Sequence, residues 1–212
     1  VILPAVAIGK HQRLLKLQAE MRERFANSKF NEITGSGKIG IVASGVGYAY
    51  TKEALERLGL TGKIKVCKVG TSYPLPSKFM AEFFQGLERV LVIEEGSPVL
   101  EEQVIETAWD LGVKFELLGK RTGTVPVAGE FNVDLVGRII AEFAGVEGNF
   151  GSKRQAPPQL PVRPPVLCAG CPHRGSFYAF KRAARGLDAV FSGDIGCYTL
   201  GAAKPLSAMD TC

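Results

Sequence analysis

Residues 38–69, KIGIVASGVGYAYTKEALERLGLTGKIKVCKV, carry two short apolar runs on either side of a segment of helical length. The run over 38–44 predicts a strand, 48–58 predicts a helix, and 63–69 predicts a second strand. Gly59 lies where a helix C-terminal cap belongs. Because near-continuous Val, Ile and Leu runs are typical of strands buried on both faces, this stretch predicts a β–α–β unit in a parallel sheet.

Strands and helices are expected to keep alternating after residue 69. Two further strands are predicted, over 89–94 and 113–118. Three helices are predicted around them, two of them capped by Ser77 and Asn132, over 77–85, 98–111 and 132–143. The pattern predicts an α/β domain whose parallel sheet is covered by helices on both faces.

The first 35 residues predict a connecting helix rather than part of the sheet. Five apolar side chains recur there at roughly helical spacing among Arg, Lys and Glu, namely Leu14, Leu15, Leu17, Met21 and Phe25. This spacing predicts an amphipathic helix.

Five prolines between Gly148 and Pro165 mark a change in the character of the chain. Proline fixes the backbone and removes hydrogen-bond donors, so this segment predicts a semi-rigid linker. A new start follows, with a short strand at 166–168, a helix over 172–185 and a strand at 188–191. We therefore divide the chain into a connecting helix (1–35), an α/β domain (36–147), a linker (148–165) and an incomplete second α/β domain (166–212). We expect it to be the middle of a longer polypeptide, because its first residue is not Met and the second domain has barely begun.

Composition excludes several classes of protein. The 212 residues are 46% hydrophobic and 22% charged, which is ordinary for a soluble globular chain. The net charge of +5 is dispersed and forms no basic stripe with interleaved aromatics, which argues against nucleic-acid binding. No apolar stretch approaches the roughly 20 residues that span a bilayer, which argues against a membrane protein. Five cysteines without a regular framework favour a reducing, cytoplasmic setting.

Gly45-Val-Gly47 lies between a predicted strand and helix, where a dinucleotide-binding fingerprint would lie. Tyr50 occupies the place of the third glycine, and no acidic residue closes the second strand. We therefore interpret this segment as a tight strand-to-helix turn without a ligand.

Glu94-Glu95 follows the strand over 89–94. Adjacent strand residues point to opposite faces, so the two carboxylates are not expected to act on one substrate atom. An interface or a helix cap is the favoured role. Cys67 is expected to be buried and inert, and His11 solvated.

Cys168 and Cys171 form a close pair of thiols, and Cys197 follows on the next turn. Thiols at this spacing are compatible with a zinc site completed by His173 or Cys212, with a redox dithiol, with an iron–sulfur cluster, or with the lining of a cofactor pocket. The spacing alone leaves these alternatives open.

Gly193-Asp-Ile-Gly196-Cys197 predicts a turn after an apolar strand. Its two glycines let backbone amides approach a bound group closely, and Cys197 and Thr199 follow at contact distance. The alternative is an ordinary β-turn without a ligand.

Three segments, 168–174, 192–201 and 208–212, closely resemble the start of the thiamine-diphosphate domain in the α subunit of indolepyruvate ferredoxin oxidoreductases. Two earlier segments, GTSYPLP at 70–76 and VIEEGSPVLEEQ at 92–103, resemble the transketolase C-terminal-like domain that precedes it. The resemblance covers nearly the whole chain. It implies a parallel-sheet transketolase C-terminal-like domain followed by an incomplete α/β thiamine-diphosphate-binding domain.

The resemblance also implies an activity, namely oxidative decarboxylation of an aryl 2-oxoacid such as indolepyruvate to an aryl-acyl-CoA, with ferredoxin as electron acceptor. Thiamine diphosphate, Mg2+ and 4Fe-4S clusters are the implied cofactors, and a β subunit is the implied partner. The activating Glu is expected outside this chain, so residues 1–212 alone are expected to be inactive. A pyruvate or general 2-oxoacid ferredoxin oxidoreductase and a zinc-stabilised interaction module are the alternatives.

By the same resemblance, the cofactor-binding residues are expected near the C-terminal end, at His173, Asp194, Ile195, Gly196, Cys197, Tyr198, Asp210 and Thr211. In related ketoacid oxidoreductases, thiols placed like Cys168, Cys171 and Cys197 hold a four-iron cluster, so these three are candidate iron–sulfur ligands here.

Overall fold

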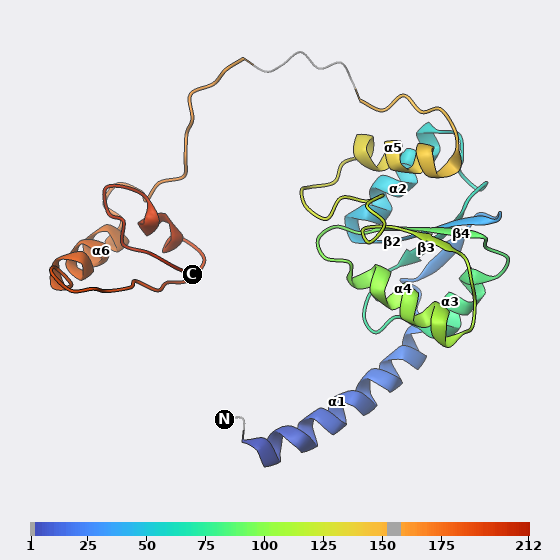
Figure 1. Cartoon of the computed structure of the whole chain (residues 1–212), viewed down its shortest axis with the longest axis horizontal. Helices are drawn as coiled ribbons and strands as arrows, with labels where there is room; N and C mark the ends of the chain where they lie inside the picture. The colour runs from blue at the N-terminus through green and yellow to red at the C-terminus, as the bar shows by residue number, and fades with distance from the viewer. Residues whose placement is uncertain (1–2, 152–157) are drawn as a thin grey trace. The chain divides into compact units, whose positions relative to one another are not determined.

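A five-stranded sheet lies at the centre of the first of two units into which the chain divides, residues 1–154 and 155–212 (Figure 1). The computed structural model describes residues 3–151 and 158–212. The strands are β1 (Glu32–Thr34), β2 (Ile39–Ser44), β3 (Lys65–Val69), β4 (Arg89–Ile93) and β5 (Glu116–Leu118). They lie in the order β1-β3-β2-β4-β5, and every neighbouring pair is parallel except β1 and β3.

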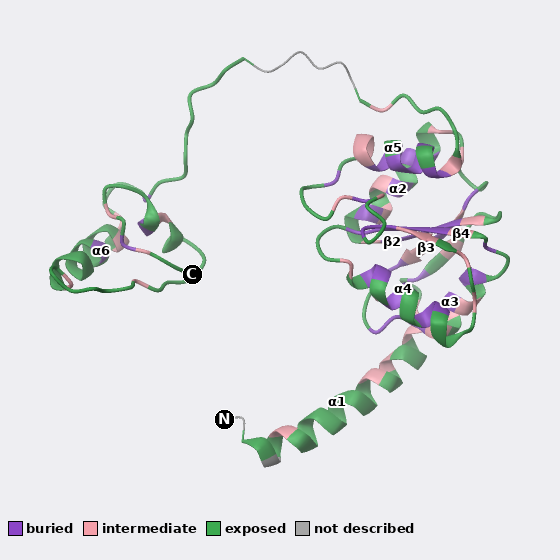
Figure 2. Cartoon of the chain, in the orientation of Figure 1, coloured by how far each residue is buried: buried purple, intermediate pink, exposed green. Residues whose placement is uncertain are grey.

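Helices cover both faces of this sheet (Figure 1). The helices of the first unit are α1 (Pro4–Phe25), α2 (Gly45–Arg57), α3 (Ser77–Phe84), α4 (Val99–Asp110) and α5 (Val133–Ala144). Helices α2 and α5 pack on one face, and α3 and α4 pack on the other. Figure 2 shows that burial is concentrated on the strands and on the inward sides of these four helices.

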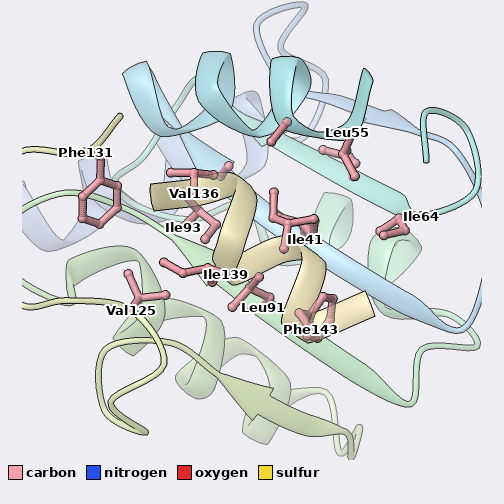
Figure 3. Close-up of a cluster of buried hydrophobic side chains, with 14 residues drawn as sticks. Ile41, Leu55, Ile64, Leu91, Ile93, Val125, Phe131, Val136, Ile139 and Phe143 are labelled. Carbon is pink, nitrogen blue, oxygen red and sulfur yellow. The ribbon is translucent and has the colours of Figure 1, made fainter. Parts of the chain in front are cut away.

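The two central strands supply the core for both faces. Along β4, Leu91 and Ile93 pack toward α2 and α5, whereas Val90 and Val92 pack toward α3 and α4. This is the alternation that a strand imposes on successive side chains. Figure 3 shows the first of these clusters, in which Leu91 and Ile93 lie with Ile41 against side chains of α5. The predicted α/β class is therefore confirmed.

The predicted parallel sheet is confirmed only in part, because β1 is an antiparallel edge strand. It pairs with β3 so that Ile33 lies opposite Cys67. Three residues with one apolar side chain give no strand pattern that sequence periodicity could detect. Asn31 instead holds β1 at the edge of the sheet, because its amide side chain joins the start of β1 to the segment after β3.

Two helix starts differ from the sequence-based expectation. Helix α2 begins at Gly45, so the first glycines after β2 form its first turn instead of a separate loop. Gly47 lacks a side chain because a Cβ there would lie 3.0 Å from the carbonyl oxygen of Ile93.

Ser77 does not cap α3, since Pro76 holds the N-cap position without a side-chain hydrogen bond. Asn132 does cap α5, because its Oδ1 accepts a hydrogen bond from the backbone N–H of Leu135 at 2.9 Å.

The first unit extends past residue 147. Phe150, expected within the linker, packs against the first core cluster, and its ring lies where a Cβ on Gly137 would be. The rest of the expected linker includes residues 152–157, which lie outside the described residues.

The second unit contains one α-helix, α6 (Pro172–Ala183), and a short 3-10 helix (Thr199–Ala202) among its described residues. The strands expected over 166–168 and 188–191 are not formed. In their place, Ser192 and Thr211 form a single parallel bridge. The apolar residues at 188–191 find no neighbouring strand in the described residues, and a strand needs a partner to satisfy its backbone. Among the described residues, no helix is long and apolar enough to cross a membrane.

Replacing Asn31 by Ala is expected to destabilise the first unit. The Asn31 Oδ1 accepts hydrogen bonds from the backbone N–H groups of Gly70 and Thr71 at 2.9 and 3.0 Å, and its amide donates to the Phe25 carbonyl at 2.9 Å. Because the substitution leaves partly buried backbone groups unpaired, the free energy of unfolding should fall by about 2 kcal/mol.

Urea denaturation of the two proteins measures this difference. Asn27→Ala is the matched control, because Asn27 is exposed and its side chain makes no hydrogen bond among the described residues. Equal losses in the two variants would contradict the role assigned to Asn31.

Candidate functional site

The second unit has a small core around which the predicted site residues are arranged. Leu167, Phe177 and Ala208 are its buried apolar residues, and four partly buried side chains pack against them, namely Cys171, Leu200, Leu206 and Met209. Phe177 comes from α6, and Gly201 lies so close to its ring that a Cβ there would clash at 2.6 Å. This core fixes the start of α6 relative to the segments that follow it.

The predicted turn at 193–197 is tied to residues 210 and 211 by the backbone. The carboxylate of Asp210 accepts a hydrogen bond from the backbone N–H of Phe191 at 2.8 Å, and its own N–H donates to the Phe191 carbonyl at 2.8 Å. The N–H of Gly193 donates to the Thr211 carbonyl at 2.9 Å. Two segments that sequence analysis singled out separately therefore form one local structure.

The turn presents backbone donors to solvent. The carboxylate of Asp194 accepts a hydrogen bond from the next N–H at 2.7 Å, and the Asp194 carbonyl accepts one from the Thr199 hydroxyl at 3.3 Å. Within the described residues, the N–H groups of Gly196, Cys197 and Tyr198 donate no hydrogen bond. Gly196 has φ of +132°, a conformation that only glycine adopts without strain, and no atom lies within 4 Å of where its Cβ would be. The three adjacent donors are thus available to an anionic group.

The start of α6 brings a thiol, an imidazole and a phenol together. The Sγ of Cys171 lies 3.2 Å from the Nδ1 of His173. The His173 ring meets the Tyr198 ring edge-on, with centroids 4.7 Å apart. Arg174 holds this region by donating from Nε to the Cys168 carbonyl at 3.0 Å. The helix start and the 193–198 turn are therefore in contact through His173 and Tyr198.

The cysteines are not gathered into a metal site. Cys168 and Cys197 are exposed and Cys171 is half-buried, and all are free thiols. In residues 3–151 and 158–212, no three His, Cys, Asp or Glu side chains are placed to hold a metal ion. Iron–sulfur ligation by Cys168, Cys171 and Cys197 therefore stays a prediction. Burial raises the pKa of the Cys67 thiol, which agrees with its expected inertness.

A cavity of about 360 Å³ opens in the first unit at the carboxyl ends of β2 and β4. The sheet order changes direction between these strands, and ligands of open α/β sheets bind at this position. Its lining comes from the end of β2 and the first turn of α2, from the segment after β3, and from the loop that leads into α4, including Ser44, Gly47, Ser72, Glu94 and Ser97.

Glu94 caps α4 from this cavity. Its two carboxylate oxygens accept hydrogen bonds from the backbone N–H groups of Leu100 and Glu101 at 2.7 and 2.8 Å. The residue is only 6% exposed. Glu95 also lines this cavity, and its carboxylate accepts from the N–H of Phe131 at 2.6 Å. The expected cap is therefore confirmed, and the two carboxylates bond different backbone groups.

Two buried charged residues beside Glu94 were missed by sequence analysis. The Glu101 carboxylate accepts a hydrogen bond from the Lys120 N–H at 2.8 Å and also bonds the Arg121 N–H. The Nζ of Lys120 donates to the Pro126 carbonyl at 2.5 Å. The helical spacing of α4 could have identified Glu101 as buried, because it lies on the inward side of the helix between Leu100 and Val104. No sequence pattern indicates that Lys120 is buried.

Burial and neighbouring charges shift the pKa values of Glu94 and Lys120. Burial raises the pKa of the Glu94 carboxyl, although its two backbone hydrogen bonds and the charge of Lys120 act in the opposite direction. Burial likewise lowers the pKa of the Lys120 ammonium, against the attraction of the neighbouring glutamates. The network is satisfied throughout, since no buried side-chain nitrogen or oxygen of the described residues lacks a partner.

Comparison with known proteins decides the family. Residues 32–145, from β1 to the end of α5, match the indolepyruvate oxidoreductase domain. The chain belongs to the indolepyruvate oxidoreductase family. The resemblance identified from the cysteine, GDIGC and IEEG segments is thereby confirmed.

The similarity extends over both units. The chain is 43% identical to indolepyruvate oxidoreductase subunit IorA of Pyrococcus abyssi, over 100% of this chain and 33% of the relative. It is also 43% identical to the IorA subunit of Thermococcus kodakarensis over the same shares. The IorA subunit of Archaeoglobus fulgidus is 40% identical over 99% of this chain and 34% of the relative. The chain thus spans about a third of the length of these family members.

The pH dependence of stability tests the assignment of Glu94. Glu94→Gln keeps the side-chain size but removes the ionisable group. Because the folded pKa of Glu94 is raised, the folded protein retains a proton that the unfolded chain releases just above the usual Glu value of about 4.3. The wild-type protein should therefore gain stability relative to Glu94→Gln as the pH falls through the raised folded pKa toward about 4.3.

Denaturant unfolding of both proteins across this range measures the difference, and every other carboxylate is common to the two. A difference that stays constant, or that shrinks as the pH falls, would show that the Glu94 pKa is not raised.

Proposed function

We propose that this chain is part of a thiamine-diphosphate-dependent oxidoreductase. The complete enzyme would convert aryl 2-oxoacids, indolepyruvate among them, to aryl-acyl-CoA, and would pass the electrons to ferredoxin. Its first unit would be the transketolase C-terminal-like domain, and its second unit the start of the thiamine-diphosphate domain. Mg2+, 4Fe-4S clusters and a β subunit belong to the same proposal, as does a cytoplasmic location.

One observation carries this proposal. Similarity to IorA subunits runs through the whole chain at 38–43% identity, so it includes the second unit as well as the matched domain. The segments 168–174, 192–201 and 208–212, on which the cofactor expectation rests, lie inside the aligned region.

The second unit supplies groups that suit a diphosphate. The N–H groups of Gly196, Cys197 and Tyr198 are adjacent and donate no hydrogen bond among the described residues. Adjacent backbone amides in a turn form an anion-binding concavity. No side chain at Gly196 obstructs it. These residues would hold the diphosphate, and thiamine diphosphate, when bound, supplies a nucleophilic carbon and an electron sink.

The remaining candidate residues divide into two roles. His173 and Tyr198 are in ring contact beside the turn, so they would line the space that the cofactor occupies. Asp210 and Thr211 act through the backbone, because they bond Phe191 and Gly193 and hold the turn in position. Asp210 would therefore also be a positioning residue, since one oxygen of its carboxylate accepts the Phe191 N–H.

Gly196→Ala tests the role of the turn in the complete enzyme, which contains this chain and its partner subunit. Alanine at φ of +132° is strained by roughly 1–3 kcal/mol, so the turn should change shape and lose its aligned donors. We expect the KM for thiamine diphosphate to rise on the order of tenfold, measured as indolepyruvate-dependent reduction of ferredoxin in the presence of CoA.

Gly175→Ala is the matched control. Gly175 lies inside α6 with no atom within 4 Å of its Cβ position and no positive φ, so alanine should be tolerated or stabilising. An unchanged cofactor dependence in Gly196→Ala, or an equal effect in both variants, would contradict the assignment of the turn.

A second prediction concerns residues 1–212 by themselves. If the activating Glu and the rest of the cofactor site belong to other segments, this polypeptide should show no indolepyruvate-dependent reduction of ferredoxin with thiamine diphosphate, Mg2+ and CoA added. The complete enzyme, assayed in parallel, serves as the positive control. Turnover by residues 1–212 alone would overturn the proposed division of the active site.

A further inference from the structure

The outward side of α4 carries an apolar pair that the fold does not bury. Trp109, the only tryptophan in the chain, is 85% exposed, and Ile105, one helical turn before it, is 40% exposed. Both side chains line a surface hollow of about 460 Å³ together with Glu102, Glu106 and Arg121. The inward side of the same helix is fully used in packing.

An exposed tryptophan of this kind is typical of a binding surface. Trp buries a large apolar area when it is covered, and it is enriched among the residues that dominate interface energies. Because the four-helix packing of the first unit is complete without Trp109, its side chain contributes little to the core.

The charges around this pair indicate the chemistry of the occupant. Glu102, Glu106 and Asp110 lie at successive four-residue spacings and form an acidic ridge along α4. Arg121 pairs with Glu102 at 2.6 Å. Glu106 and Asp110 have no ion-pair partner within the described residues. An element that combines apolar and basic side chains would therefore complement this surface.

Helix α1 of the same chain has these properties. Leu14 and Leu17 are 48% and 46% exposed and lie on one side of the helix. Lys10 and Arg13 flank them, and residues 4–25 contain five Lys or Arg and two acidic residues. The C-terminal end of α1 is attached to the first unit by a salt bridge between Glu23 and Lys78, whereas residues 8–17 are exposed.

We propose that α1 of one copy packs on α4 of a second copy. In this arrangement Leu14 and Leu17 cover Ile105 and Trp109, and Lys10 and Arg13 lie beside Glu106 and Asp110. Each copy contributes one α1 and one α4, so the contact occurs twice and closes a two-fold dimer. The proposal does not depend on the proposed catalytic function.

Tryptophan fluorescence and sedimentation of the 1–212 chain test this dimer together. Because Trp109 is the only tryptophan, its emission reports on this surface alone. We expect a concentration-dependent dimer whose formation shifts the emission maximum to shorter wavelength. A chain that stays monomeric at all concentrations overturns the proposal, and so does a dimer in which Trp109 keeps the emission of a water-exposed indole.

Variants in α1 separate this contact from a general hydrophobic effect. Leu14→Gln with Leu17→Gln should raise the dimer Kd by on the order of 30-fold or more, the effect of removing interface anchors. Leu15→Gln is the matched control, because Leu15 is 52% exposed on the same helix but points away from the Leu14 and Leu17 side. Equal effects of the two variants would contradict the proposed face.

Charge reversal provides a test that simple loss of stability cannot imitate. The variants Lys10→Glu with Arg13→Glu, and Glu106→Lys with Asp110→Lys, should each dimerise at least tenfold more weakly alone, because like charges then face each other at both contacts. When the two variants are mixed, each contact again joins opposite charges, so heterodimers should form with nearly wild-type Kd. Failure of the mixture to associate better than either variant alone would overturn the proposal.

Discussion

The burial of β2 and β4 between two helical layers is the constraint on which the rest of the structure depends. Ile41, Val42, Leu91 and Val92 are at most 1% exposed, and their side chains alternate between the two faces. A strand covered on both sides must be apolar at every position and must be followed by a helix that returns over the sheet. The same constraint sets the switch-point cavity, since β2 and β4 end side by side there. It also places the N-terminus of α4 where the buried carboxylate of Glu94 can cap it.

This constraint explains which parts of the fold were predictable from sequence. The apolar runs of β2, β3 and β4 and the helices after them follow from periodicity, because the physical cause of each element lies within its own residues. Strand β1 was missed because its pairing depends on Asn31 and on contacts with Gly70 and Thr71 far along the chain. The strand expected at 188–191 failed for the opposite reason. Three of its four residues are apolar, but among the described residues this segment gains no more than the single bridge between Ser192 and Thr211.

The candidate site likewise has features that local sequence predicts and features that depend on contacts between distant residues. Sequence patterns identified the GDIGC turn and the 208–212 segment, and the structure joins them through Asp210, whose carboxylate accepts the Phe191 N–H. The contact between His173 and Tyr198 was not predictable, because it depends on how α6 packs on a three-residue core. The three cysteines are free thiols, and their role as iron–sulfur ligands stays a prediction. Spacing along the chain therefore identified the residues, whereas their roles depend on distances that spacing does not determine.

The central claim is that the exposed amides of Gly196, Cys197 and Tyr198 receive the diphosphate of thiamine in the complete enzyme. Hydrogen exchange of these amides, measured with and without thiamine diphosphate and Mg2+, tests it most directly. The account predicts that the cofactor slows exchange at residues 196–198, while the amides of β2 and β4 in the first unit stay unchanged. Exchange at 196–198 that is indifferent to the cofactor, in an enzyme shown to bind it, would contradict the claim.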